Sequence, residues 1–599
     1  MSSSSSGVNH NPVEYVHSIS QAGRLLPSAS QWKTNSNYDS LPSPYSKSFE
    51  YELLISDKKY FNRFLCISVT VVLLIVAIVL LVHFLPHKNQ RHGRSKNLTL
   101  ALSQALLFFD AQKSGNYPSN SPVKFRGDSG LQDGDSVPGG LVGGFYDSGN
   151  NIKFSFTTAY TITLLSWTVI EYHQKYSEIG ELDHVKDIIR WGSDYLLQVF
   201  VPPNSSSDSI TIYSQARYVY IQVGGDNDRN CWQRPEDMSY TRPVSSCNST
   251  ASDLAGEIVA ALSAASIVFE EDNAYSKQLV ETAEILFKAS TKNDMDHGQG
   301  TYTSSETCGG QARMFYSSSG FKDELLWGGT WLFFATGNNS YLQYAMDHFR
   351  AAEEEETMSE KGIFSWNNKL TANLILMARI LYFRDLGFPF GEGLGSSSNA
   401  TNLLICSYLS QESFDRTSGG LILLNPDDHD GPIKFAATAS FLSKLYSDYL
   451  ELQLRSGIKC NSDDFSLEML RNFARSQVNY ILGDNPRKMS YMVGFGNHYP
   501  THVHHRAASI PWDGRSYSCQ EGERWLQSKD QNPNILYGAM VSGPDNFENF
   551  LNERDQPRFT QPSLASNAGL VAALVALHDS NVFSLGIDPN GIFQKIDSP

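Results

Sequence analysis

Apolar residues recur every three or four positions through most of the chain, which is the spacing of one face of an α-helix. Runs rich in Gly, Pro, Asn and Asp separate these stretches and predict loops, and strand-like alternation is scarce. The pattern predicts about a dozen helices, at residues 98–112, 156–175, 183–200, 253–270, 274–290, 322–336, 339–352, 369–386, 402–412, 435–456, 466–482 and 563–578.

Helices of this number in one body favour an all-α domain, because each helix must bury its apolar stripe against others. A closed ring of helix hairpins buries them economically, and we find no close internal repeat. We therefore expect one folded region at residues 98–585 and a C-terminal tail at 586–599.

The N-terminal part of the chain has a different composition. Residues 1–63 are rich in Ser, Asn and Pro and predict a disordered tail. Residues 64–85 are 22 residues without Asp, Glu, Lys or Arg, and a helix of that length spans roughly 33 Å. The run is too long and too far along the chain for a cleaved signal peptide. We expect a transmembrane helix at 64–85, followed by a linker at 86–97.

The orientation of that helix follows from glycosylation acceptors. Basic residues flank the run on both sides, so the positive-inside rule does not decide. All Asn-x-Ser/Thr acceptors follow the run, which predicts a cytosolic tail and a lumenal or extracellular body. The chain is then a single-pass type II membrane protein of the plasma membrane or of a Golgi or endosomal membrane. The acceptors are Asn97, Asn204, Asn248, Asn338 and Asn399.

Composition narrows the function classes. The formal net charge is −16, which argues against a nucleic-acid partner, since phosphate binding needs a basic patch. Aromatic residues make up 12% of the chain, which suits stacking on sugar rings and a large core equally well. None of the seven cysteines forms a C-x-x-C pair, so a zinc ribbon is not expected. Cys231 and Cys247 close a short loop as a disulfide or lie there as two buried thiols.

Candidate chemistry begins at residues 143–154, which read GGFYDSGNNIKF. The glycines let backbone approach a ligand closely or take a positive φ. Asp147 precedes an apolar helical run, where a carboxylate can hold a water or handle a proton. The alternative is an ordinary turn that caps the following helix.

Further blocks carry a specific resemblance. They are NYILGDNP at 479–486, MSYMVGFGN at 489–497, HHR at 504–506 and CWQRPED at 231–237. With 143–154, they resemble glycoside hydrolase family nine. The tail and the apolar run resemble its plant membrane-anchored branch, the KORRIGAN-type endo-β-1,4-glucanases. This resemblance implies an (α/α)6 barrel with an open cleft for a β-1,4-glucan chain and no required cofactor. It also implies hydrolysis of the glucan with inversion at the anomeric carbon, taking place at or near the cell wall.

The resemblance also shows a departure at the reacting groups. Inverting hydrolysis needs a protonated carboxyl for the leaving oxygen and an ionised one for the water. The family's Asp-x-Gly-Asp falls on residues 147–150, so Asp147 is kept and the usual base is Asn150. The family's acid Glu falls on Gln561, and its supporting Asp falls on Asn552. An amide neither ionises nor releases a proton near neutral pH, so we expect hydrolysis to be weak or lost.

Other positions implied by the resemblance concern substrate contact. Trp232, Trp366 and Trp327 match aromatic positions near glucose rings, with core packing as the alternative for each. His504 and Arg506 match substrate-contacting residues, and Tyr146 lies in the same motif as Asp147.

Some positions depart from the family pattern or suggest a metal. Arg229 stands where the family commonly has His, and Asn367 stands where it has Asp. Adjacent residues rarely aim at one ion, so the HHR block predicts no metal site. Asp253 and Glu257 are expected to be a helix cap and a solvated acid, with calcium as the alternative because some family members bind it.

These observations leave three hypotheses and leave open whether the chain is an enzyme. The first is a membrane-anchored endoglucanase-family protein acting on cell-wall glucan, with hydrolysis weak or lost. The second is an active inverting endoglucanase in cellulose synthesis and wall remodelling, for which Glu553 or Asp555 would have to substitute as the acid. The third is a non-catalytic glucan-binding protein or a partner of a cellulose synthase complex. A purely structural membrane protein would explain the anchor but not the motifs.

Overall fold

The structure is a computed structural model. It describes residues 58–84, 96–135, 139–201, 211–214, 231–240, 242, 244–247, 251–291, 298–304, 308, 315–425, 431–460, 464–579 and 585–596. The chain divides into two units, residues 1–92 and 93–599. Several predictions lie outside the described residues: the tail up to residue 57, most of the linker, Arg229, and the acceptors Asn204 and Asn248.

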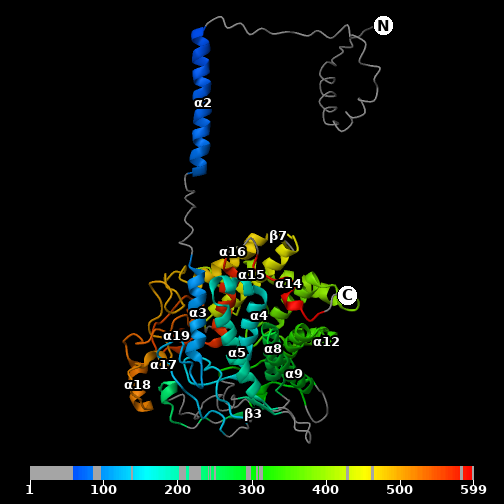
Figure 1. The fold of residues 1–599 in the computed structure, drawn as a ribbon, viewed down its shortest axis with the longest axis vertical. Coiled ribbons are helices and arrows are strands. Elements are labelled where there is room, and N and C mark those ends of the chain that lie inside the picture. The colour runs from blue at the N-terminus through cyan, green and yellow to red at the C-terminus, as the bar shows by residue number, and fades with distance from the viewer. Residues whose placement is uncertain are drawn as a thin grey trace, which may run out of the picture. The chain divides into compact units, whose positions relative to one another are not determined.

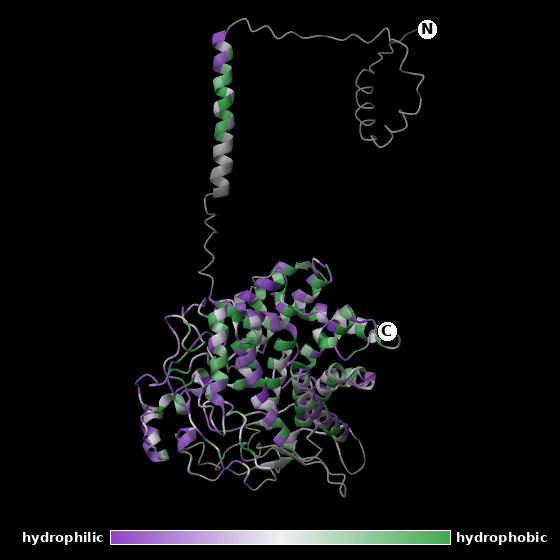
Figure 2. Ribbon diagram, in the orientation of Figure 1, coloured by the Kyte–Doolittle hydropathy of each residue, from purple (hydrophilic) through white to green (hydrophobic). Residues whose placement is uncertain are grey.

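In the first unit the structure describes helix α2, Lys58–Phe84. Its first turns are hydrophilic and the next turns, in the upper half of the helix, are mostly hydrophobic (Figure 2). The helix covers nearly all of the predicted membrane segment at 64–85. Among the described residues, no helix is both long enough and apolar enough to cross a membrane.

The second unit is mostly helical (Figure 1), and its contacts define a closed ring of helices. Each helix of this inner ring packs on the next, and the last packs back on the first. In chain order the ring consists of α4 (Ser155–Ile179), α8 (Ser252–Val268), α11 (Lys322–Thr336), α13 (Leu370–Phe383), α15 (Ile433–Leu452) and α20 (Leu564–Leu577). Such a ring has no open edge, so its helices are apolar or small on nearly every side; residues 252–266 of α8 are all buried.

An outer layer covers the inner ring, one helix on each inner helix. Outer helices bury only one stripe: α12 buries Leu342, Ala345 and Ala352 and exposes its charged residues. The outer helices are α3 (Leu98–Gln112) on α20, α5 (Leu182–Gln198) on α4, α9 (Asn273–Ser290) on α8, α12 (Asn339–Glu355) on α11, α14 (Phe390–Leu409) on α13 and α16 (Leu467–Ile481) on α15. The body is therefore a mostly helical (α/α)6 barrel, as the sequence predicts.

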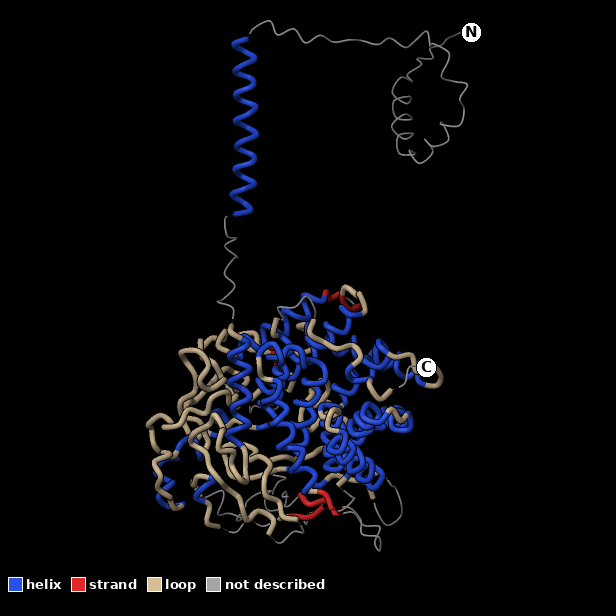
Figure 3. Tube along the Cα trace, viewed as in Figure 1, coloured by secondary structure: helices blue, strands red, loops and turns tan. Residues whose placement is uncertain are grey.

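Strands and short helices make up the remainder (Figure 3). The described strands form small antiparallel sheets, in which β1 (Phe200–Val201) pairs with β2 (Thr211–Ser214) and β2 with β3 (Ser245–Cys247), β4 (Asp415–Arg416) with β5 (Ile422–Leu423), and β6 (Gly457–Lys459) with β7 (Asp464–Ser466). The short helices are η2 (Pro235–Asp237), η3 (Tyr302–Ser304), α17 (Arg506–Ser509), α18 (Cys519–Gln527), α19 (Pro557–Thr560) and η5 (Gly591–Phe593).

The cysteines pair differently from the prediction. The disulfides are Cys231–Cys519, Cys247–Cys308 and Cys406–Cys460, so a Cys231–Cys247 bridge is wrong. The segment with Cys231 lies against α18, and β3 carries Cys247 to a different neighbour. Partners 288 and 61 residues away cannot be read from local spacing.

Candidate functional site

The predicted site residues gather where the inner helices begin. Inner and outer helices alternate along the chain, so the inner helices run in the same direction and their N-termini share one end of the barrel. Asp147 precedes α4, Gln561 precedes α20, and Trp366 precedes α13. Side chains as far as 413 positions apart in the sequence thus meet at one end of the ring.

Backbone hydrogen bonds hold three of these segments together. The amide of Leu564 donates to the Asp147 carbonyl at 2.9 Å, and the amide of Arg506 donates to the Gly149 carbonyl at 3.1 Å. The amide of His504 donates to the Thr560 carbonyl at 3.1 Å. The motifs at 143–154 and 504–506 and the segment before α20 are therefore joined to one another by backbone hydrogen bonds.

Gly149 is required by this arrangement. A Cβ at this position would lie 1.7 Å from the His504 carbonyl oxygen, which is far inside van der Waals contact. The glycine of the Asp-x-Gly-Asp motif is therefore explained by the close passage of the 504–506 segment.

Asp147 is the only carboxyl at the four positions where the resemblance predicts the catalytic acids, and it lies beneath the surface with 1% of its area exposed. The Thr157 hydroxyl donates to Oδ1 at 2.5 Å and the Tyr316 hydroxyl donates to Oδ2 at 2.5 Å. Burial raises the pKa of Asp147 to about 6, although both hydrogen bonds act in the opposite direction.

This raised pKa predicts a pH-dependent stability difference. Because the buried site disfavours the ionised carboxyl, the stabilising contribution of Asp147 is full below about pH 4 and is lost as the pH rises through about 6. Wild type should lose up to about 2–3 kcal/mol relative to Asp147→Asn between pH 4 and pH 7. Melting temperatures of both proteins across this range measure it, and a constant difference would contradict it.

Hydrogen bonds hold the side-chain amides of Asn150 and Asn552 in place. Asn150 Oδ1 accepts from the amide of Ile152 at 2.9 Å. Asn552 Oδ1 accepts from the amides of Thr501 and His502, both at 3.1 Å, and its Nδ2 donates to Thr501 Oγ1 at 3.1 Å. Each amide oxygen thus occupies a place that a carboxylate oxygen could fill with the same donors.

Gln561 is the C-cap of α19 and lies three residues before the start of α20. Its Nε2 donates to Ser148 Oγ at 2.9 Å, and Ser148 adjoins Asp147. Two hydrogen bonds fix its backbone carbonyl, from the amide of Ser542 at 2.9 Å and from the Ser542 hydroxyl at 2.8 Å. The side chain at the predicted acid position is therefore partly buried, held in place and unable to release a proton.

The two acids considered as substitutes lie elsewhere. Glu553 and Asp555 are both exposed. The Glu553 carboxylate lies 3.6 Å from Lys529, with 46% of its side chain exposed. Arg554 between them is buried and donates to backbone carbonyls of the 525–530 segment. This anchoring fixes the register of the loop, so the exposed acids cannot slip into the position of residue 561.

His504 and Arg506 form a cluster with Trp232. His504 Nδ1 donates to the Arg554 carbonyl at 2.7 Å, and burial lowers the pKa of His504 to about 4, so the ring is neutral with Nε2 as an acceptor. Trp232 packs edge-on against His504 and beneath the Arg506 guanidinium. With 3% of its area exposed, Trp232 supports the two polar residues and offers almost no free face.

The other two tryptophan candidates, Trp366 and Trp327, differ in exposure. Trp366 is partly exposed, packs edge-on against Phe156 and Tyr316, and borders a small hollow with Lys434. Trp327 is fully buried against Trp167 and belongs to the core.

Tyr146 is also buried, with 2% of its area exposed and the guanidinium groups of Arg126 and Arg242 over its ring. Direct substrate contact therefore remains a prediction that fits Trp366 better than Tyr146.

Asp253 and Glu257 differ from the prediction. Both are fully buried, so a solvated acid at 257 is wrong. Asp253 accepts from the amides of Leu254 and Tyr302, and burial raises its pKa to about 7. Glu257 and Glu324 flank the Lys369 ammonium at 3.1 and 3.2 Å, all with fully buried side chains. An i,i+4 acid on an inner barrel helix faces the core rather than water.

Sequence reasoning missed several residues of this region. Tyr316 and Thr157 contact Asp147 directly, and Ser148 contacts Gln561. Lys369 forms ion pairs with the buried carboxylates of Glu257 and Glu324. Only Ser148 lies inside a recognised motif. In the part of the chain that the structure describes, no group of three or more His, Cys, Asp or Glu residues is arranged to hold a metal ion.

Comparison with known proteins agrees with this architecture. Residues 99–574 match Glycosyl hydrolase family 9, and the chain belongs to this family. It is 45% identical over 556 residues to "Endoglucanase 21" of Arabidopsis thaliana, covering 91% of this chain and 87% of that protein. It is 44% identical over 553 residues to "Endoglucanase 10" of Oryza sativa subsp. japonica, with the same coverage.

Solved structures are similar as well. The endoglucanase of the termite Nasutitermes takasagoensis matches with a TM-score of 0.66 and 31% identity, over 81% of this chain and 99% of the termite chain. The cellulase Cel9M of C. cellulolyticum in complex with cellobiose matches with a TM-score of 0.64 and 26% identity, over 81% and 99% of the two chains.

Proposed function

We propose that this chain binds β-1,4-glucan at the N-terminal end of its inner helices and hydrolyses it weakly or not at all. The observation that carries the proposal is the hydrogen bond from Gln561 Nε2 to Ser148 Oγ at 2.9 Å. It puts an amide, held in place, where family resemblance puts the proton donor. Asn150 stands likewise where the base is expected.

The expected loss of rate is large. A positioned general acid or base contributes about 10²–10⁴ in rate, and inverting hydrolysis uses one of each. Groups that act as a unit are not additive, so the combined loss lies between about 10² and 10⁸. Asp147 keeps a carboxyl, but both of its oxygens already accept hydroxyl hydrogen bonds in a buried position. It can orient neighbouring groups and has no exposed face for the leaving oxygen.

The binding half of the proposal rests on what the site retains. Trp366 keeps a partly exposed ring and His504 a neutral acceptor nitrogen, which together offer stacking and hydrogen bonding to a sugar. Arg506 is buried behind them and donates to the Cys231 carbonyl. Related family structures were solved with cellobiose in Cel9M and with cellotetraose in CelQ of Clostridium thermocellum.

Replacing the stacking residue should weaken binding. Trp366→Ala is expected to lower the affinity for cellohexaose by about tenfold, since loss of an aromatic face costs roughly 0.5–1.5 kcal/mol beyond buried area. Trp366→Tyr is the matched control and should retain most of the affinity. Calorimetric titration of the full chain in detergent measures both. Equal affinity in wild type and Trp366→Ala would remove Trp366 from the site, and no binding by wild type would overturn the proposed function.

Membrane anchoring is part of the same proposal, supported by the uncharged run at 64–85 and by three acceptors that are exposed on the body. Asn97, Asn338 and Asn399 are exposed, and the first two use only Oδ1 as a helix cap, which leaves Nδ2 for a glycan. We expect the full chain to resist carbonate extraction and to shift in mass after glycan removal. Release by carbonate, or an unglycosylated protein from plant membranes, would contradict this orientation.

A second candidate is an active endoglucanase that works slowly with Asp147 alone. The observation in its favour is the raised pKa of Asp147, about 6, which leaves part of this carboxyl protonated at mildly acidic pH. A role as a partner of a cellulose-synthesising complex would rest on the same retained site and the same loss of acid and base.

A further inference from the structure

Two hollows lie on the flank of the barrel, beside the outer helix α3, and both are bordered by Pro122. Each has a volume of about 530 Å³. One takes Leu107 and Ala111 of α3 as part of its wall, and the other takes Asp110 and Lys113 of the same helix and its C-cap. The residues that hold the candidate acid and base positions border neither hollow.

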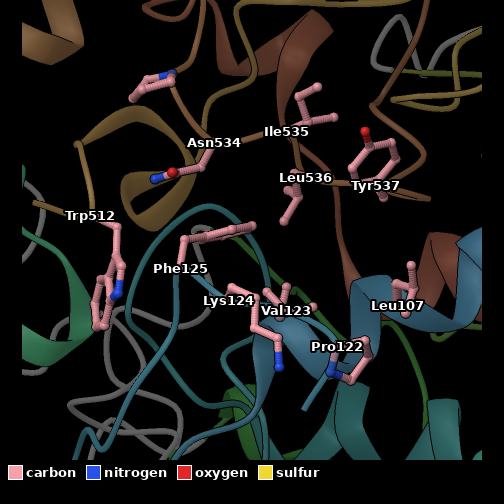
Figure 4. Close-up of a pocket in the computed structure, with 12 residues that line it drawn as sticks. Leu107, Pro122, Val123, Lys124, Phe125, Trp512, Asn534, Ile535, Leu536 and Tyr537 are labelled. Atoms are coloured by element: carbon pink, nitrogen blue, oxygen red, sulfur yellow. The ribbon is translucent and has the colours of Figure 1, made fainter. Parts of the chain in front are cut away.

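The first hollow is aromatic and apolar (Figure 4). Trp512 and Tyr537 stand at opposite ends, each with 43% of its area exposed, and Phe125 and Leu536 lie between them. The Arg234 guanidinium lies 5.1 Å from the centre of the Trp512 ring and fixes its orientation. Exposed aromatic faces of this kind suit the flat apolar faces of sugar rings.

The second hollow is polar. Trp191 borders it and is fixed by a hydrogen bond from its Nε1 to the Gly144 carbonyl at 2.9 Å. Asn120, Ser121 and exposed carboxylates surround it and offer both donors and acceptors to hydroxyl groups.

The two linings carry no excess of positive charge. They contain four aspartates against Lys113, Lys124, His184 and Arg190, on a chain whose net charge is −16. Lys113 and His184 both contact Asp110 at 2.7 Å, and Arg190 contacts Asp272, which lies outside both linings, at 3.1 Å. Such a lining gives no net attraction to a polyanion, and its exposed carboxylates accept hydrogen bonds from hydroxyl groups. It fits a neutral, hydroxyl-rich ligand.

We propose that these two hollows form an accessory groove for a neutral linear β-glucan, separate from the candidate active site. The shared border at Pro122 makes the hollows neighbours, and a polymer long enough to lie in both would contact Trp512, Tyr537 and Trp191. The proposal rests on the proposed function, because it assigns the same class of polymer to a second surface. A second contact on one chain of polymer raises the effective affinity without any change at the first.

The test uses the full chain in detergent and separates the two sites by ligand length. The double variant Trp512→Ala/Tyr537→Ala is compared with wild type by affinity electrophoresis in hydroxyethyl cellulose and by titration with cellotetraose. We expect about a tenfold weaker retardation by the polymer and unchanged cellotetraose affinity. Phe388→Ala is the matched control and should behave as wild type, because this side chain is 99% exposed and precedes α14, which packs on α13 and not on the helices beside the two hollows.

Each outcome has a distinct meaning. Retardation of the double variant equal to wild type would overturn the accessory groove and leave this aromatic surface to a protein partner. If wild type does not bind cellotetraose, that result would instead overturn the proposed function. If the double variant melts below wild type, the single variants Trp512→Ala and Tyr537→Ala are measured in its place. Lys124→Glu provides a further check, since a neutral ligand predicts less than a twofold change.

Discussion

Restoring the three acids is expected to switch on hydrolysis. The variant Asn150→Asp/Asn552→Asp/Gln561→Glu should cleave carboxymethyl-cellulose at least about 10²-fold faster than wild type, because it regains a positioned acid and base worth about 10²–10⁴ each. The structure favours the exchange. Asn150 and Asn552 already accept backbone hydrogen bonds through Oδ1, as carboxylates would. The Ser148 hydroxyl, which now accepts from Gln561, can rotate to donate to a carboxylate at position 561.

Single substitutions are the matched controls for this experiment. Gln561→Glu alone supplies an acid without a base, and Asn150→Asp alone supplies a base without an acid, so neither should approach the triple variant. Reducing-end release is measured from pH 4 to pH 8. A wild type that already cleaves at the rate of the triple variant would show that another pair of groups performs the chemistry.

The second large effect concerns the buried ions behind the site. Lys369→Met should destabilise the barrel by about 3–5 kcal/mol, because it leaves Glu257 and Glu324 buried without their shared cation. The apparent melting temperature should fall by on the order of 5 °C or more. The loss should grow as the pH rises, since burial raises the pKa of Glu257 to about 7 even beside Lys369, and its ionised form is then unpaired.

Lys277→Met is the control for that prediction. Lys277 contacts Glu281 at 3.5 Å, but their side chains are 74% and 59% exposed, so the change should stay within about 0.5 kcal/mol. If the Lys369→Met protein has the same melting temperature as the Lys277→Met control, the buried carboxyls are already protonated and need no cation.

The helical pattern predicts the barrel well because each outer helix keeps one clear apolar face and each inner helix is a long run of apolar and small residues. The predicted 98–112 and 322–336 coincide with α3 and α11. The exception is α14, predicted at 402–412 and observed at Phe390–Leu409. Its first turns contain Gly391, Gly393 and Gly395, and glycines at this density predict a loop because Gly disfavours a helix. The glycines are accommodated because α14 packs on α13, and packing overrides the weak local preference.

The site was predictable only where a motif carries it. Asp147, Gly149 and the 504–506 block were found because their spacing in the sequence is specific. Tyr316 and Lys369 were not, since each acts through a contact with a residue 169 or 112 positions earlier in the chain. The same limit applies to Cys231, whose partner lies 288 residues away. Local patterns cannot report contacts that exist only after the ring has closed.

The most direct test of the central claim measures binding and cleavage in one sample. Purified wild-type chain is titrated with cellohexaose in a calorimeter, and the same solution is then held for hours and examined by chromatography for shorter sugars. Our account predicts a measurable heat of binding and intact cellohexaose. Release of cellobiose, cellotriose or cellotetraose on the timescale of an active endoglucanase would contradict it.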